Sequence, residues 1–182
     1  VYALITPSEF LKKKLSLNGF EEKRIHCIPT FTASKTTIGK QQIGSYGLYF
    51  GRVTEEKGVE TVIKAYEKLP EYTVKIMGDD TTDEAKRLKK YVENHKMKNV
   101  EFLGFKSGAE LENVIKGARF TLIPSIWYDN LPNTALESFQ YSKPVIASNI
   151  GSLPELVIDG ENGYLFKPSN VEDLIKKIKM LD

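Results

Sequence analysis

The chain has 182 residues, a formal net charge of +2, 41% hydrophobic residues and 27% charged residues. This length and composition predict one well-formed domain with an appendage, and the nearly balanced charge excludes nucleic-acid binding driven by bulk electrostatics. The single cysteine excludes an internal disulfide framework, and no apolar run approaches the length of a membrane span.

The first 29 residues predict a strand, a helix and a second strand. The apolar run 1–5 precedes Thr6-Pro7-Ser8-Glu9, which has the pattern of a capping box with proline at the first helical position. A helix is expected over Glu9–Leu17 and a short strand over Arg24–Pro29. The polar stretch 30–45 has no convincing periodicity, so we expect a mobile connection between two domains. Because the chain starts in mid-motif without methionine, we expect it to be a portion of a longer protein.

From residue 46 onward, strand and helix patterns alternate, which is typical of a Rossmann-like, doubly wound α/β fold with a parallel sheet. The apolar runs predict strands at Gly47–Phe50, Tyr72–Met77, Val100–Leu103, Arg119–Ile123, Pro144–Ala147 and Tyr164–Phe166. The helical patterns fall at Lys57–Lys68, Thr82–His95, Ala109–Lys116, Thr134–Tyr141, Leu153–Val157 and Val171–Met180. Two of these helices follow capping-box patterns, Ser107-x-x-Glu110 and Ser169-x-x-Glu172.

Two cations follow the first strand of this region. The segment 48–58 has the pattern of a strand, a tight turn at Gly51 and a helix start, with Arg52 and Lys57 close to the turn. Arginine offers a planar fork of donors and lysine a compact point charge, so the two together could neutralise a diphosphate. Ordinary surface charge is the alternative. Neither a dinucleotide fingerprint nor a P-loop string is present.

Two carboxylates flank another predicted helix start. The buried strand that ends at Ile123 precedes an Asp-Asn-Leu-Pro-Asn turn, which places Asp129 in the loop and Glu137 in the first helical turns. A helix start favours a bound phosphate, and a carboxylate one turn further in could accept hydrogen bonds from ribose hydroxyls. On spacing alone, a turn aspartate and a solvated glutamate are the favoured explanation of the pattern, because motif matches in a single sequence are weak evidence.

Other polar residues have ordinary explanations. His26 and His95 lack neighbours at metal-ligand spacing, and a Gly-Asp-Asp turn that opens a helix explains Asp79, Asp80 and Asp83 as capping and dipole partners. Trp127 and Tyr128 suit either sugar stacking or anchoring of the loop. We therefore expect no metal site.

Four segments together resemble the C-terminal, donor-binding domain of family 4 retaining glycosyltransferases, which have the GT-B fold. They are GRVTEEKGVETVIKAYEKLP, YTVKIMGDD, VEFLGF and SIWYDNLPNTALESFQYSKPVIASNIGSLPELVIDGENGYLF. The resemblance implies that residues 46–182 bind a nucleotide sugar. It also implies that residues 1–29 end an N-terminal acceptor domain and that residues 30–45 connect the two domains.

The resemblance also implies roles for individual residues. Arg52 and Lys57 would hold the diphosphate, Glu137 the ribose and Asp129 the donor sugar, although the family has a longer glutamate at the position of Asp129. The implied donor-binding residues are Gly51, Arg52, Lys57, Gly78, Asp79, Gly104, Phe105, Asp129, Asn130, Leu131, Pro132, Asn133, Thr134 and Glu137. Of these, Arg52, Lys57, Asp129 and Glu137 would be catalytic, by stabilising the leaving diphosphate and positioning the donor.

The expected activity is therefore hexosyl transfer, with mannose as the sugar, to a glycan or lipid-linked acceptor in polysaccharide assembly. GDP-mannose is the first expected donor and a UDP-sugar the second, with no cofactor or metal. The resemblance implies a cytoplasmic enzyme, leaves peripheral membrane association open and predicts that this portion alone is inactive. A nucleotide-sugar epimerase or phosphorylase of the same fold is the alternative. A signalling receiver domain would need acids after its first strand, where this chain has Gly51 and Arg52.

Overall fold

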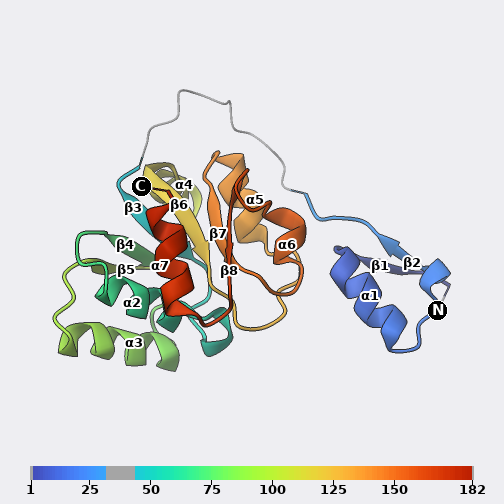
Figure 1. Ribbon diagram of the computed structural model, residues 1–182, viewed down its shortest axis with the longest axis horizontal. Helices are drawn as coiled ribbons and strands as arrows, with labels where there is room; N and C mark the ends of the chain where they lie inside the picture. Colours follow the sequence, from blue (N-terminus) through green and yellow to red (C-terminus); the bar gives the residue numbers. More distant parts are fainter. Residues whose placement is uncertain (1, 32–43, 182) are drawn as a thin grey trace.

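The computed structural model describes residues 2–31 and 44–181, which form two parallel sheets (Figure 1). The small sheet pairs β1 (Leu4–Thr6) with β2 (Ile25–Cys27), and the chain between them forms α1 (Glu9–Leu17) and the 3-10 turn η1 (Glu22–Arg24). This is the predicted strand–helix–strand unit, with both strands shorter than expected. Most of the predicted connection over residues 30–45 lies outside the described residues.

The large sheet has six parallel strands in the order β5-β4-β3-β6-β7-β8. These strands are β3 (Tyr46–Phe50), β4 (Val74–Met77), β5 (Val100–Gly104), β6 (Ala118–Ile123), β7 (Val145–Ser148) and β8 (Gly163–Phe166). The chain builds outward from β3 to β5 and then returns to the other side of β3 with β6. The strand order therefore reverses between β3 and β6, and ligands of open α/β sheets bind at the carboxyl ends of strands beside such a switch point.

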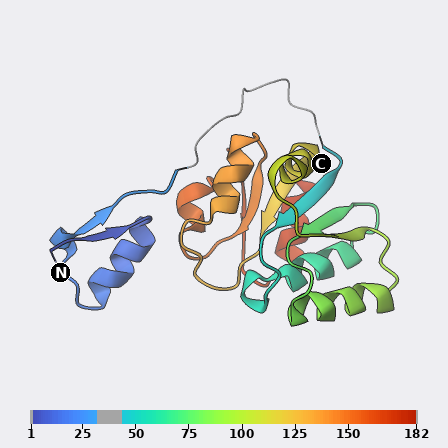
Figure 2. The ribbon, with the colours of Figure 1, turned by 180° about the vertical axis from the view of Figure 1, so that it is seen from behind.

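Helices cover both faces of the large sheet, so the predicted doubly wound α/β fold is confirmed. The helices are α2 (Val59–Glu67), α3 (Asp83–Asn94), α4 (Gly108–Gly117), α5 (Asn133–Gln140), α6 (Leu153–Leu156) and α7 (Val171–Lys179). Helix α7 lies in front of the sheet in Figure 1 and behind it in Figure 2, whereas α4 lies on the opposite face. Within the described ranges, no helix combines the length and apolar character needed to cross a bilayer.

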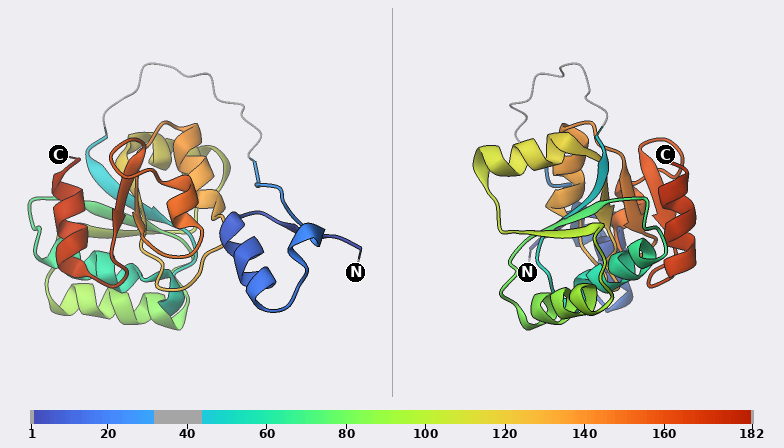
Figure 3. Two further views of the ribbon diagram at one scale, coloured as in Figure 1. Left: turned by 45° about the vertical axis from the view of Figure 1, so that its right-hand side comes forward. Right: turned by 90° about the vertical axis from the view of Figure 1, so that its left-hand side faces the viewer.

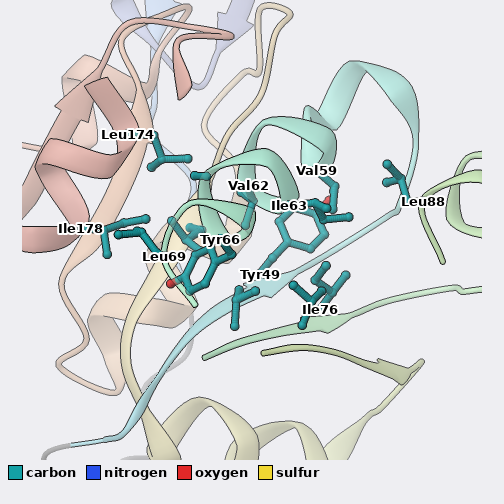
Figure 4. Close-up of a cluster of buried hydrophobic side chains, with 14 of the residues drawn as sticks. Tyr49, Val59, Val62, Ile63, Tyr66, Leu69, Ile76, Leu88, Leu174 and Ile178 are labelled. Carbon is teal, nitrogen blue, oxygen red and sulfur yellow. The ribbon is translucent and has the colours of Figure 1, made fainter. Parts of the chain in front are cut away.

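Alternating side chains of the strands build a core on each face. On one face, Tyr49 of β3 and Ile76 of β4 pack with the apolar sides of α2, α3 and α7 (Figure 4). On the other face, Leu48 and Phe50 of β3 pack with Ile115 of α4. Buried parallel strands are apolar on both sides, which is why these runs contain so few polar residues. The rigid sheet fixes where each strand ends and thus where the following loops begin.

The predicted capping of three helices needs correction, although α1 and α7 begin at the predicted residues Glu9 and Val171. Helix α1 is capped by Ser8, whose Oγ accepts from the Leu11 N–H at 3.1 Å, and not by the capping box that begins at Thr6. Asn170 caps α7 in place of Ser169. Ser107 does occupy the cap position of α4, but its side chain makes no capping hydrogen bond. For α1 and α7 two small polar residues lie close together, and the backbone geometry decides which one reaches the exposed N–H groups.

The helix predicted from Lys57 is also interrupted at its start. Residues Glu55–Lys57 form a separate 3-10 turn, η2, and α2 begins at Val59 after Gly58 in the left-handed conformation. Lys57 therefore ends a turn and does not begin the helix.

Candidate functional site

Loops at the carboxyl ends of β3, β4, β5 and β6 meet beside the switch point. Two adjoining pockets lie there, and both are lined by Phe50, Gly51, Arg52 and Thr134. Pocket A has a volume of about 330 Å³ and pocket B about 210 Å³. The loops that line them come from segments more than 80 residues apart, and the sheet brings them together.

Pocket A is the more apolar of the two. Its other lining residues are Met77, Gly78, Asp79, Phe105, Lys106, Leu111 and Glu137. Phe105 is 74% exposed, so its ring can accept a flat partner without displacing core residues. Glu137 contributes a carboxylate to the lining of pocket A.

Partial burial raises the pKa of the Glu137 carboxyl above its ordinary value. Burial is the cause of this shift, and among the described residues no charged or hydrogen-bonding neighbour contributes to it. A half-buried carboxylate that its neighbours do not stabilise can accept hydrogen bonds from the hydroxyl groups of a ligand in the pocket.

Pocket B contains an ion pair that joins two distant loops. Lys57 Nζ lies 2.5 Å from Asp129 Oδ1, and Ser125 Oγ donates a hydrogen bond to Asp129 Oδ2. Asp129 is 8% exposed, so both of its carboxylate oxygens are used inside the protein. The other lining residues of pocket B are Tyr49, Leu122, Ile123, Pro132 and Asn133. The structure thus brings the predicted cation and the first predicted acid together.

Arg52 lies at the boundary of the two pockets. Its side chain is 74% exposed, and within the described residues its one ionic neighbour is Glu56, at 3.9 Å from Nη2 to Oε1. An exposed pair at this distance contributes little free energy. Arg52 can therefore swing toward an anion in either pocket, whereas Lys57 is held in place.

Ser152 fixes the loop between β6 and α5 through two hydrogen bonds to the backbone of the loop. The Oγ of Ser152 accepts from the Leu131 N–H at 2.6 Å and donates to the Asp129 carbonyl at 2.9 Å. Leu131 has a φ of 49°, a left-handed conformation that these bonds hold in place. Pro132 follows as the cap residue of α5, and the first residues of that helix, Asn133 and Thr134, line pocket B. The first N–H groups of a helix have no partner inside the helix.

The sequence-predicted residues divide into two groups. Eleven line one or both pockets: Gly51, Arg52, Lys57, Gly78, Asp79, Phe105, Asp129, Pro132, Asn133, Thr134 and Glu137. Gly104, Asn130 and Leu131 line neither pocket. The Gly104 carbonyl accepts from the Gly78 N–H, and Asn130 Oδ1 accepts from Ser8. Through these two contacts, Gly104 and Asn130 hold neighbouring segments of the chain in place.

The acids after β4 have partners of their own. Asp79 Oδ1 accepts from the backbone N–H and the hydroxyl of Thr81, and Asp80 pairs with Lys89 at 2.5 Å. The cap of α3 is Thr82, not one of the aspartates. Among the described residues, no group of three or more histidine, cysteine or acidic side chains could hold a metal ion.

Sequence reasoning missed Ser125, Ser152 and Gly58. The two serines act through contacts with Asp129, Ser152 from the cap position of α6 and Ser125 from the same loop, and no sequence motif marks either contact. Gly58 does carry a signal, since a glycine after a charged turn is a common left-handed residue. Its φ is 67°, and a Cβ there would lie 2.1 Å from the Pro124 carbonyl oxygen. Gly58 thus lets the Lys57 turn approach the strand end that leads to Asp129.

We expect Gly58→Ala to destabilise the protein well beyond the conformational cost alone. Gly160 is the matched control, because it has a φ of 87° and nothing within 4 Å of an added Cβ. Gly160→Ala should lower the free energy of unfolding by about 1 kcal/mol. Gly58→Ala should cost about 1–3 kcal/mol more, because backbone must shift. Urea unfolding measures both, and equal losses would contradict the close approach of these two loops.

The model of the family described as "Glycosyl transferases group 1" matches residues 34–181. An uncharacterized glycosyltransferase of Methanocaldococcus jannaschii is 34% identical over 134 residues, covering 74% of this chain and 37% of that protein. The glycogen synthase of Mycobacterium tuberculosis is 30% identical, covering 82% of this chain and 36% of the synthase. The chain therefore spans little more than a third of these curated relatives.

Solved structures with the GT-B fold resemble the described chain closely. The Anabaena protein Alr3699/HepE, solved in complex with UDP and glucose, has a TM-score of 0.86 at 21% identity and matches 99% of this chain and 53% of its own. The apo form of the lipopolysaccharide outer core galactosyltransferase WaaB has a TM-score of 0.82 at 22% identity, with 100% and 53% covered. These likenesses confirm the fold.

Proposed function

The chain belongs to the glycosyl transferases group 1 family, and from this we propose that it binds the nucleotide-sugar donor for a sugar transfer to an acceptor hydroxyl. The observation that carries the proposal is the convergence of Lys57, Arg52 and Glu137 on two adjoining pockets at the sheet's switch point. A cationic pocket beside an apolar pocket matches a ligand with a charged diphosphate and a flat base.

Pocket B would take the diphosphate. Lys57 supplies a fixed positive charge, Arg52 a mobile one, and the start of α5 supplies N–H groups with the positive end of its dipole. As the bond to the sugar breaks, negative charge grows on the leaving diphosphate, and these groups stabilise it. No general acid is needed for that step.

Asp129 would have a second role besides the contact with the donor sugar that the family resemblance implies. Its carboxylate holds Lys57 and accepts from Ser125, so we propose that it orients the lysine as well as facing the donor sugar. The shorter side chain of aspartate, compared with the family's glutamate, suits this tight pair.

Pocket A would take the nucleoside. Glu137 would accept hydrogen bonds from the ribose hydroxyls, and Phe105 with Met77 would contact the base. We propose GDP-mannose or a UDP-sugar as the donor and no metal or other cofactor. The resemblance in sequence favours GDP-mannose, and the UDP complexes of the structurally similar Anabaena protein favour uridine.

We propose retention of anomeric configuration and membership of family 4, on the motif resemblance alone. The acceptor, a glycan or lipid-linked sugar, would contact a domain outside this chain, which spans about half of the similar solved structures. Peripheral association of the whole enzyme with the cytoplasmic face of a membrane belongs to the same proposal. No described residue specifically favours an epimerase or a phosphorylase.

Calorimetric titration of the 182-residue chain with UDP, GDP and ADP tests the proposal. We expect weak binding of one nucleoside diphosphate and clearly weaker binding of the corresponding nucleoside, because pocket B recognises charge. We also expect no sugar transfer, since the opposite wall of the cleft is missing. Absence of binding to all three would overturn the donor-site proposal, and sugar transfer by this chain alone would overturn the two-domain one.

A further inference from the structure

Helix α1 is in direct contact with the loop that carries Asp129 and with α6, although each of these contacts joins residues more than 100 positions apart in the sequence. Figure 3 shows α1 beside the domain built on the large sheet. The contact consists of hydrogen bonds from the start of α1 to Asn130 and Glu155, and of an aromatic contact between Phe10 and Tyr128.

Glu155 receives the first two N–H groups of α1. The Glu9 N–H donates to Oε2 at 2.9 Å and the Phe10 N–H donates to Oε1 at 2.5 Å. The third N–H, of Leu11, donates to Ser8 Oγ. A helix start leaves such N–H groups without partners inside the helix and carries partial positive charge. Here a carboxylate from α6 supplies two of the three partners.

The same helix start contacts the loop on both sides of Asp129. Ser8 Oγ donates to Asn130 Oδ1 at 2.6 Å, and the Phe10 ring lies 5.1 Å from the Tyr128 ring. The Lys14 ammonium lies 4.9 Å from the centre of the Tyr128 ring. Tyr128 and Asn130 thus face α1, while Asp129 between them faces Lys57 in pocket B.

Glu155 is also close in sequence to Ser152, which holds the loop between β6 and α5 by hydrogen bonds to the backbone of Leu131 and Asp129. The short helix α6 therefore holds α1 through Glu155, and its cap residue Ser152 holds the loop that carries Asp129. A shift of α1 would pull on Tyr128 and Asn130 and would move the residue between them.

We infer that Glu155 is a positioning residue, which clamps α1 onto the loop 127–131 and thereby sets Asp129 and Lys57 for the diphosphate. This inference rests on the proposed function. In a two-domain enzyme the clamp would transmit the position of the N-terminal segment to the donor pocket, with Glu155 touching no part of the donor.

Hydrogen exchange of the Glu9 and Phe10 amides in the 182-residue chain tests the clamp without any ligand. Glu155→Ala should accelerate their exchange at least about fivefold, a typical effect for the loss of a helix cap. Glu155→Gln retains one acceptor oxygen and should restore part of the protection. Glu161→Gln, an exposed acid on the following turn, is the control and should change nothing. Unchanged exchange in Glu155→Ala would overturn the clamp.

Titration with UDP and GDP tests the coupling. Glu155→Ala should weaken binding of the nucleoside diphosphate about threefold or more, because the loop loses preorganisation, and Glu155→Gln should recover part of it. Faster exchange with unchanged affinity would overturn the coupling. If the parent chain binds no nucleotide, the proposed function fails, yet the exchange comparison still decides whether Glu155 clamps α1.

Discussion

Replacing Lys57 by methionine should weaken binding of a nucleoside diphosphate by about 10- to 150-fold, which corresponds to roughly 1.5–3 kcal/mol for one lost charged hydrogen bond. Methionine keeps the apolar stem of the side chain and removes the charge. The uncharged nucleoside should bind the variant and the parent almost equally. Calorimetry with the two ligands measures this contrast, and equal losses for both would mean that Lys57 supports the fold of the site.

The ion pair with Asp129 makes a second control necessary. Without Lys57, the nearly buried Asp129 carboxylate keeps Ser125 as a partner but loses its counter-charge, so the variant should also be less stable. The double variant Lys57→Met with Asp129→Asn removes both charges and should regain most of the lost stability, measured by urea unfolding, but not the affinity. Lys64→Ala removes a surface partner of Glu60 and should alter neither quantity.

Replacing Glu137 by alanine should weaken nucleoside diphosphate binding by a similar factor, about 10- to 150-fold, if the carboxylate accepts the ribose hydroxyls. A 2′,3′-dideoxynucleoside diphosphate lacks those hydroxyls. It should bind the parent chain as weakly as the ordinary nucleotide binds Glu137→Ala, and the variant should not distinguish the two ligands. Discrimination that persists in the variant would assign the ribose to another residue. Glu93→Ala, at an exposed position on α3, is the matched control.

The pH dependence of affinity gives a separate measure of Glu137. Burial raises the pKa of this carboxyl, so its protonation begins at a higher pH than for an exposed glutamate, whose pKa is about 4.3. The carboxylate is the better acceptor, so affinity should be fully present above the raised pKa and should fall as the pH drops through it. Glu137→Gln should lose this part of the pH dependence, while titration of the ligand's own phosphate stays common to both proteins.

The order of strands and helices could be predicted from the sequence because it depends on local rules. Apolar runs bounded by turn residues marked all six strands of the large sheet, and the predicted helix Glu9–Leu17 agrees with α1 at both ends. The same local reasoning placed Arg52 after β3 and Glu137 in the first turns of α5. The residues that cap these helices were predicted less well, since Ser8 and Asn170 took the place of neighbouring polar residues.

Only the tertiary structure decided which of these groups meet. Lys57 and Asp129 are 72 residues apart, and Glu155 lies 146 residues from Glu9, so no sequence period connects either pair. The parallel sheet brings the ends of β3 and β6 together, and the left-handed turn at Gly58 then allows the lysine to reach the aspartate. Residue types and their spacing determined the fold and the kinds of chemistry available, because both depend on interactions between near neighbours. The choice of partners depended on the topology of the sheet and on close backbone approaches, which join residues that are distant along the chain.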